Sequence, residues 1–190
     1  MLGSLHKIEL KEYSSHIYKI IVYEQEQQEY YTFTTIECAQ AIDLYLDYRK
    51  RFGEELRPNS PLVREQFDTT DKFKVSRPQF LSIVSFRVMM DRMLLLAGLR
   101  NRSKGYRNLH NVMCSHGFRK FTITQMKKAQ LDFSDREYLV GHKGSRGLDV
   151  NYDRTTEEDR LQEYLKAIDL QYRLKIGYDA RYRNNITQLK

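Results

Sequence analysis

Ser115-His116-Gly117-Phe118-Arg119-Lys120 is followed along the chain by Leu139-Val140-Gly141-His142 and then by Asn151-Tyr152-Asp153-Arg154. His116 and Arg119 stand three positions apart at the start of a predicted helix, so both side chains project from one face of that helix. The first turn of a helix also presents N–H groups and a positive dipole end, which favour a bound phosphate. A histidine and an arginine at this spacing are common by chance. The pattern gains its weight because His142 and Tyr152 follow in order.

The first third of the chain has the alternation typical of antiparallel strands. A β-branched and aromatic run lies on each side of the polar turn at 25–28, which predicts a hairpin. Thr34 and Glu37 have the spacing of a capping box, so a helix of about four turns is expected up to Gly53. Its apolar stripe consists of Cys38, Ile42, Tyr45 and Leu46. The polar segment 54–78 contains all three prolines and is expected to be an irregular surface connection without a functional site.

Four more helices are predicted in the second half of the chain. One should occupy residues 79–97, where methionines and leucines are expected to pack in a core, and another should begin near Ser115. Ser134 and Thr155 are each followed three positions later by a glutamate, which predicts capping boxes for the last two helices, the first of them ending at Gly141. The last helix carries an apolar stripe that must be buried. It consists of Leu161, Tyr164, Leu165, Ile168 and Tyr172.

The composition is that of one folded domain. The chain has 190 residues, of which 41% are hydrophobic and 30% charged, a balance that excludes a disordered protein. No stretch is long and apolar enough for a membrane span, and the N-terminus does not have the pattern of a signal peptide. Two cysteines provide no disulfide framework, which indicates a cytoplasmic protein.

The charge favours a polyanionic partner. Lys and Arg outnumber Asp and Glu by 32 to 25, and the pI is about 9.3. Many of the basic residues are clustered between positions 100 and 128, as a surface that follows a phosphate backbone requires. They are Arg100, Arg102, Lys104, Arg107, Arg119, Lys120, Lys127 and Lys128.

The order HxxR, then Gly-His, then Tyr resembles the signature of the tyrosine recombinases, and the resemblance covers nearly the whole chain. It is closest to archaeal and archaeal-virus integrases of mobile elements. The segments that carry it are Val22-Tyr23-Glu24, Glu29-Tyr30-Tyr31-Thr32-Phe33, Ser60-Pro61-Leu62, His116-Gly117-Phe118-Arg119-Lys120 and Gly147-Leu148-Asp149. The resemblance implies an α+β, mainly helical catalytic domain with a small antiparallel sheet at one edge. Residues 1–176 are then an N-terminally truncated catalytic domain and residues 177–190 a polar tail.

The resemblance also implies an enzyme, a site-specific DNA recombinase that cleaves and rejoins strands through a 3′-phosphotyrosyl intermediate. Tyr152 is the expected nucleophile. A tyrosine phenol has a pKa of about 10 and needs a base and cationic neighbours to react, so His116 is the candidate base. Arg119 can bind two oxygens of the attacked phosphate, and His142 can donate a further hydrogen bond to it. The phosphotyrosyl ester conserves the bond energy, so no cofactor, ATP or metal is expected.

Duplex DNA is the partner that the resemblance implies, with a location at the nucleoid of the cytoplasm. Lys120, Arg107, Lys127 and Lys143 are the expected DNA-binding residues. The protein is further expected to form a homo-oligomer on DNA through its C-terminal helix.

Three departures from the family pattern weaken the expected activity. Met1 stands where the family has an arginine, the turn from Glu24 to Glu29 lacks the lysine that the family uses there, and Asp153 replaces a second tyrosine that many relatives carry. Recombination by this chain alone is therefore expected to be inefficient.

Other interpretations remain open. The chain could be a catalytically silent, truncated integrase relative that only binds DNA or a partner integrase. A helix-turn-helix regulator would explain the basic helices but not His142 or Tyr152. His110, Cys114 and His116 suggest zinc, but a fourth ligand is not evident, and no metal site is predicted.

Overall fold

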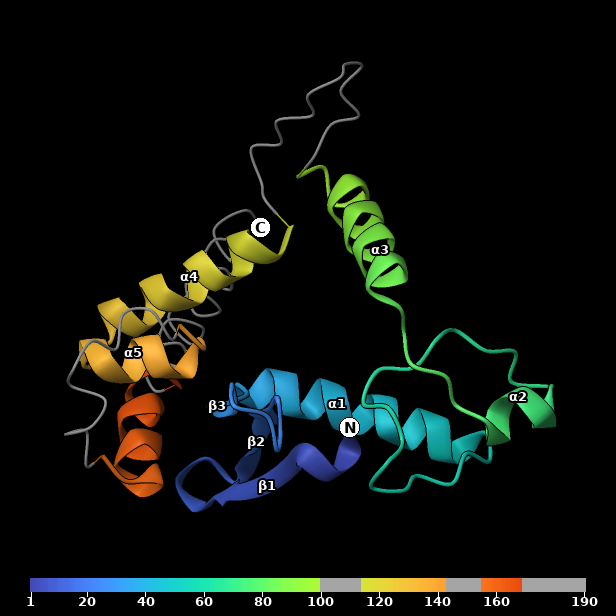
Figure 1. Cartoon of the computed structure of the whole chain (residues 1–190), viewed down its shortest axis with the longest axis horizontal. Helices are drawn as coiled ribbons and strands as arrows, with labels where there is room; N and C mark the ends of the chain where they lie inside the picture. Colours follow the sequence, from blue (N-terminus) through green and yellow to red (C-terminus); the bar gives the residue numbers. More distant parts are fainter. Residues whose placement is uncertain (100–113, 143–154, 169–190) are drawn as a thin grey trace, which may run out of the picture.

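The computed structural model describes residues 1–99, 114–142 and 155–168 (Figure 1). They form an α+β fold with a three-stranded antiparallel sheet, which agrees with the expected α+β class and its small antiparallel sheet. The elements are a 3-10 turn at Leu2–Ser4, β1 (Leu5–Leu10), a 3-10 turn at Lys11–Tyr13, β2 (Ser15–Val22), β3 (Tyr30–Phe33), α1 (Ile36–Arg51), α2 (Lys72–Ser76), α3 (Ile83–Leu96), α4 (Cys114–Lys128), α5 (Phe133–Leu139) and a C-terminal helix over residues 157–168. Within these ranges, no helix combines the length and apolar character that a membrane crossing needs.

The predicted hairpin is formed by β2 and β3, with Val22 paired to Tyr30 and Lys19 to Phe33. Strand β1 pairs along the other side of β2, with Ile8 opposite Ile17. Among the side chains of β1, only that of Leu10 is buried. The strand lies at the edge of the sheet and alternates only weakly between apolar and polar residues, so the sequence pattern predicted the hairpin but not this third strand.

The predicted capping box places the N-cap of α1 at Thr34, but the helix begins one residue later. Thr35 is the N-cap, and its side chain accepts a hydrogen bond from the backbone N–H of Cys38. The hydroxyl of Thr34 is already engaged, because it accepts a hydrogen bond from the backbone N–H of Tyr18 in β2. Cys38 is exposed, whereas the other members of the predicted stripe are half-buried. The predicted stop is confirmed, since Gly53 follows α1 with a φ of +91°.

The caps of the last two helices also differ from the prediction. Asp132 is the N-cap of α5 and accepts a hydrogen bond from the backbone N–H of Ser134 at 2.8 Å, so the predicted capping box beginning at Ser134 is wrong. The C-terminal helix has a reciprocal capping box, but it joins Thr156 and Asp159. It therefore lies one residue beyond the predicted pair that begins with Thr155.

Helix α3 departs most from expectation. It begins at Ile83, after the N-cap Ser82, rather than at residue 79. Its methionines and leucines were expected to pack in a core, but Leu94 is its one buried residue. The core prediction is therefore wrong for most of this helix.

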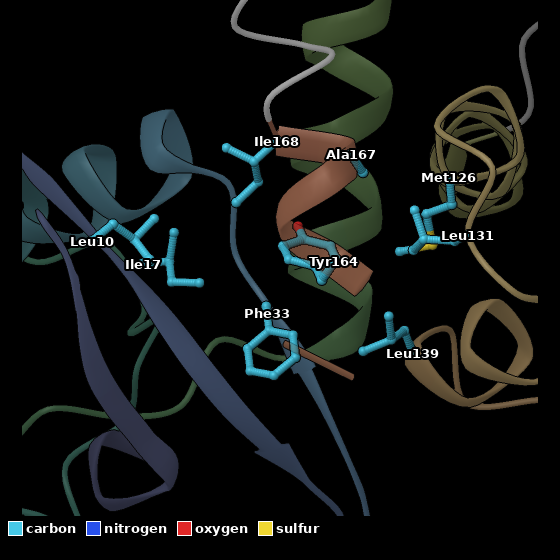
Figure 2. Close-up of a cluster of buried hydrophobic side chains, with 9 residues drawn as sticks. All are labelled: Leu10, Ile17, Phe33, Met126, Leu131, Leu139, Tyr164, Ala167 and Ile168. Carbon is cyan, nitrogen blue, oxygen red and sulfur yellow. The ribbon is translucent and has the colours of Figure 1, made fainter. Parts of the chain in front are cut away.

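The main core lies where the C-terminal helix fits between the sheet and the α4–α5 pair (Figure 2). Tyr164, Ala167 and Ile168 are buried there, and Leu161 and Leu165 pack against them. This confirms that the described part of the C-terminal stripe is buried, and it is buried within the chain itself. Tyr172 lies outside the described residues. The remaining members of the cluster are Leu10, Ile17 and Phe33 from the sheet side, and Met126, Leu131 and Leu139 from the helical side.

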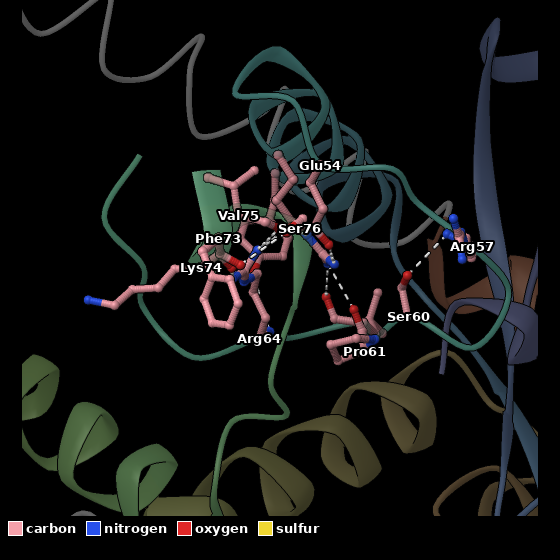
Figure 3. A network of polar contacts seen from close by, with 12 residues as sticks. Glu54, Arg57, Ser60, Pro61, Arg64, Phe73, Lys74, Val75 and Ser76 are labelled. Atoms are coloured by element: carbon pink, nitrogen blue, oxygen red, sulfur yellow. Dashed lines mark hydrogen bonds and ion pairs between the residues drawn. The ribbon is translucent and has the colours of Figure 1, made fainter. Parts of the chain in front are cut away.

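Residues 54–78 are not the loose surface connection that their composition predicts. They contain α2 and a buried ionic network that ties the segment to the end of α1 (Figure 3). Both carboxylate oxygens of Glu54 accept hydrogen bonds from Arg49, and Arg64 donates to one of them. Arg49 also donates to the carbonyl of Pro61 at 2.8 Å, and Arg64 to the carbonyl of Lys74 at 2.7 Å. Two arginines from distant positions thus converge on one carboxylate.

The charge of Glu54 holds this network together. Burial alone would raise the pKa of Glu54, but hydrogen bonds from Arg49 and Arg64 outweigh it, so the pKa lies below its ordinary value. Because the folded pKa is lowered, the stabilisation is present above the ordinary carboxyl pKa of about 4.3 and is lost as the pH falls through the lower folded value.

We predict that Glu54→Gln lowers the free energy of unfolding at neutral pH by about 3–5 kcal/mol, because it leaves two buried guanidinium groups without a counter-charge. Urea denaturation measures this. Glu55→Gln is the matched control, because Glu55 pairs with Arg57 on the surface and should contribute little. The difference between wild type and Glu54→Gln should narrow as the pH falls below about 4.3. Equal effects of the two substitutions would contradict this description of the network.

Candidate functional site

The structure describes part of the predicted site. His116, Arg119, Lys120 and Lys127 all lie on α4, and His142 follows α5. The predicted nucleophile Tyr152 lies outside the described residues, as do Arg107 and Lys143. The described part of the site therefore comprises the two motifs that should bind the phosphate.

A hydrogen bond joins these two motifs. Nη1 of Arg119 donates to the backbone carbonyl of Val140 at 2.9 Å, across a separation of 21 residues. Val140 is the C-cap of α5, two residues before His142. The first turns of α4 and the turn after α5 therefore meet, as one phosphate-binding site requires.

The turn after α5 has the geometry of a glycine-terminated helix. Gly141 adopts a φ of +73°, which glycine tolerates better than other residues. Its N–H donates to the carbonyl of Tyr138, and the N–H of His142 donates to the carbonyl of Glu137, both at 2.9 Å. These bonds end the helix and fix the backbone from which the His142 side chain projects.

Glu137 orients the imidazole of His142. Its carboxylate lies 2.9 Å from Nδ1 of the ring, and the His142 side chain is 38% exposed. When Nδ1 carries the proton donated to Glu137, Nε2 is the ring nitrogen available to a ligand. The sequence pattern had interpreted Glu137 as a capping residue. The structure instead pairs it with the histidine five positions later.

Strand β3 packs against the same turn. A Cβ on Gly141 would lie 2.5 Å from the ring of Tyr30, so the aromatic ring occupies the space that any side chain at 141 would need. The next residue, Tyr31, packs its ring against Tyr138 of α5 with centroids 4.9 Å apart. The hairpin thus lies beside the Gly-His motif.

Lys19 is the lysine of β2 that lies nearest in sequence to the acidic hairpin turn. Its Nζ donates to both carboxylate oxygens of Glu157, at 2.8 and 3.0 Å, and lies 5.8 Å from the centroid of the Tyr31 ring. The Lys19 side chain is mostly buried. This lysine therefore links β2 to the C-terminal helix.

The outer side of α4 presents cationic groups to solvent. His116, Arg119, Lys120 and Lys127 are all exposed. Within the described part of the chain, Arg119 uses one of its five N–H groups for Val140, and the side-chain ammonium groups of Lys120 and Lys127 donate to no other described residue. An anion on this surface would meet several donors at once.

Sequence reasoning missed Glu137 and Tyr30 as members of the site. The signal for Tyr30 would have been the glycine opposite it, since a glycine with positive φ often lies where another group approaches closely. For Glu137, no local sequence signal distinguishes a capping residue from a partner of His142. Among the described residues, no group of three or more His, Cys, Asp or Glu side chains is placed to hold a metal ion.

Comparison of the chain with protein families, with curated proteins and with solved structures finds no match.

We predict that Gly141→Ala destabilises the fold by more than the about 1–2 kcal/mol expected from the left-handed backbone conformation alone. The added methyl group must also displace the ring of Tyr30. Gly53→Ala is the matched control, because Gly53 has a φ of +91° but open space around it. Thermal or urea denaturation compares the two.

The second substitution, Tyr30→Ala, tests whether the ring of Tyr30 causes the additional destabilisation by Gly141→Ala. It should remove much of the excess cost in the Gly141→Ala chain, as measured by a double-mutant cycle. Identical costs at Gly141 and Gly53 would show that the Tyr30 contact does not constrain the turn.

Proposed function

We propose that this protein is a DNA strand-transfer enzyme of the tyrosine recombinase type, which cuts and rejoins duplex DNA through a covalent bond to Tyr152. The observation that carries the proposal is the hydrogen bond from Arg119 to Val140, which brings the HxxR helix beside the Gly-His turn. The two motifs are far apart in the sequence, and their meeting in one place supports a common ligand. The order of the motifs in the sequence supports a phosphodiester as that ligand.

The described residues have suitable chemistry for a phosphate in the transition state. Arg119 has further N–H groups to donate to the two non-bridging oxygens, and Nε2 of His142 can donate when the ring is protonated. Such donors stabilise the charge that develops as the phosphorus is attacked. Glu137 holds the His142 ring in one orientation, which lowers the cost of organising the site.

In the proposed reaction the phenol oxygen of Tyr152 attacks the phosphorus and its proton passes to His116. The bond from phosphorus to the 5′-oxygen breaks, and that oxygen takes up a proton and leaves as a hydroxyl group. The strand is then held as a 3′-phosphotyrosyl ester. Rejoining is the reverse reaction with the 5′-hydroxyl of another strand, so bond energy is conserved.

The surface of α4 supports duplex DNA as the substrate. Lys120 and Lys127 are exposed on the helix that carries His116 and Arg119, and the whole chain has a formal net charge of +7. Cations at these positions can track neighbouring phosphates, and such binding weakens steeply with salt because counterions are released. Arg107 and Lys143 remain proposed as further phosphate contacts.

A second candidate function is DNA binding without catalysis. It is favoured by the contacts of Lys19, because the ammonium group of this lysine is paired with the carboxylate of Glu157. The hairpin turn that follows β2 is acidic. A leaving 5′-oxygen would then lack the cation that the family supplies from the hairpin. Such a protein would occupy recombination sites or a partner integrase without cutting DNA.

The test is covalent capture on a nicked duplex. Cleavage of this duplex releases a short fragment that carries the new 5′-hydroxyl group, and this fragment diffuses away. We predict a slowly formed adduct that survives denaturing gel electrophoresis with the wild-type chain and with Tyr178→Phe, but not with Tyr152→Phe. Met1→Arg, placed behind an added start methionine, should accelerate capture by about a hundred- to a thousand-fold, because Met1 stands where the family has an arginine that donates to the phosphate. Met1→Gln is the control for this change and should have little effect.

An adduct with Tyr152→Phe would show that another tyrosine is the nucleophile. Absence of any adduct, including with Met1→Arg, from a chain that still binds the duplex would select the second candidate function.

A further inference from the structure

Helix α3 exposes an unusual amount of apolar surface. It stands away from the sheet and from α1 in Figure 1, drawn in green. Seven of its large apolar side chains are between 41% and 82% exposed. They are Ile83, Val84, Phe86, Val88, Met89, Met93 and Leu96. Contiguous apolar surface usually marks a contact with another molecule, so the residues that share one face of the helix are the decisive ones.

Four of these residues form one continuous stripe. Phe86, Met89, Met93 and Leu96 are spaced by three, four and three positions, which is the a/d pattern of a coiled-coil seam over two heptads. Val84 projects from the opposite side of the helix. The stripe is thus a defined face suited to packing against another helix.

We propose that this stripe is the dimer interface of the protein, and that its occupant is α3 of a second copy of the chain. A two-fold axis near the middle of α3 would pair the helices antiparallel. Phe86 of each copy then faces Leu96 of the other, and Met89 faces Met93, so the surface is complementary to itself. Flexible methionines at the centre of the seam allow close packing.

The exposed area of the seam suits a small interface. At roughly 200 Å² for each large apolar side chain, the exposed fractions of its four residues leave roughly 400 Å² in contact with water. Two copies would bury roughly twice that area, about half of a standard interface, which is the size of a weak, reversible contact. A second copy supplies the same apolar surface and leaves no charged group of the seam buried, because the seam contains none.

The C-terminal helix, to which the resemblance assigns assembly on DNA, does not offer its apolar stripe to a partner in this structure. Tyr164, Ala167 and Ile168 are buried in the chain's own core. Association through α3 requires neither that helix nor DNA. The inference therefore goes beyond the proposed enzymatic function and stands independently of it.

Salt should affect this dimer and DNA binding in opposite directions. Each copy carries a formal net charge of +7, so two copies repel each other at low ionic strength. Apolar contacts persist when that repulsion is screened. Dimerisation should therefore become stronger between about 0.05 M and about 0.5 M salt, whereas DNA binding becomes weaker.

Sedimentation equilibrium of the full chain without DNA tests the proposal. The expected result is a monomer–dimer equilibrium that salt shifts toward the dimer. Met93→Glu should weaken the dimer by about a hundredfold or more, because it places a charge in the seam. Val84→Glu introduces the same charge at an exposed position on the opposite side, and should change the dimerisation constant by no more than about threefold. Circular dichroism checks that both variants remain folded.

The antiparallel pairing has its own test. In a chain with Cys38→Ser and Cys114→Ser, mild oxidation of a mixture of Met89→Cys and Met93→Cys should form disulfides between the two variants faster than within either. A chain that is monomeric at all concentrations, or a dimer that Met93→Glu leaves intact, would overturn the proposal. Preferred disulfides within one variant would overturn the antiparallel arrangement.

Discussion

The guanidinium group of Arg160 holds three parts of this fold together. Its Nε donates to Asp135 of α5 and its Nη1 to the hydroxyl of Tyr31 in β3, both at 2.9 Å, and the group lies 4.0 Å from the centroid of the Tyr138 ring. Arg160 is only 4% exposed, so these contacts replace water around a buried charge. A buried arginine without them would be strongly unfavourable, so this cation favours the arrangement in which β3, α5 and the C-terminal helix meet around it.

The candidate site depends on that arrangement. Because Arg160 and Tyr31 keep α5 on β3, the turn after α5 comes to rest against Tyr30, and its carbonyl at Val140 meets Arg119. Burial raises the pKa of Tyr31, with the hydrogen bond from Arg160 opposing the rise, so its hydroxyl stays protonated and available to this contact. The catalytic proposal and the core thus rest on the same polar contacts rather than on separate ones.

The sequence pattern predicted the hairpin and the longer helices but not β1 or α2, and it could not choose between adjacent capping residues. Thr34 and Thr35 both fit an N-cap, and the choice depends on Tyr18, whose N–H engages Thr34 from another strand. Charged residues in 54–78 were interpreted as surface, because only the folded chain pairs Glu54 with two arginines. The roles of the site residues came from motif order. Their mutual placement depends on contacts over long sequence separations, which no local pattern encodes.

We propose that α4 and the turn after α5 form one phosphate-binding site on a DNA-binding surface. The chain has only five histidines, so the imidazole signals of a histidine-labelled protein can be followed one by one by NMR during titration with a short duplex at low salt. If the two motifs form one site, the signals of His116 and His142 shift together along one binding curve, and those of His6 and His16 in the sheet stay unchanged. Arg119→Ala should remove the joint response. Responses of His116 and His142 at different DNA concentrations, or a response confined to the sheet histidines, would contradict this proposal.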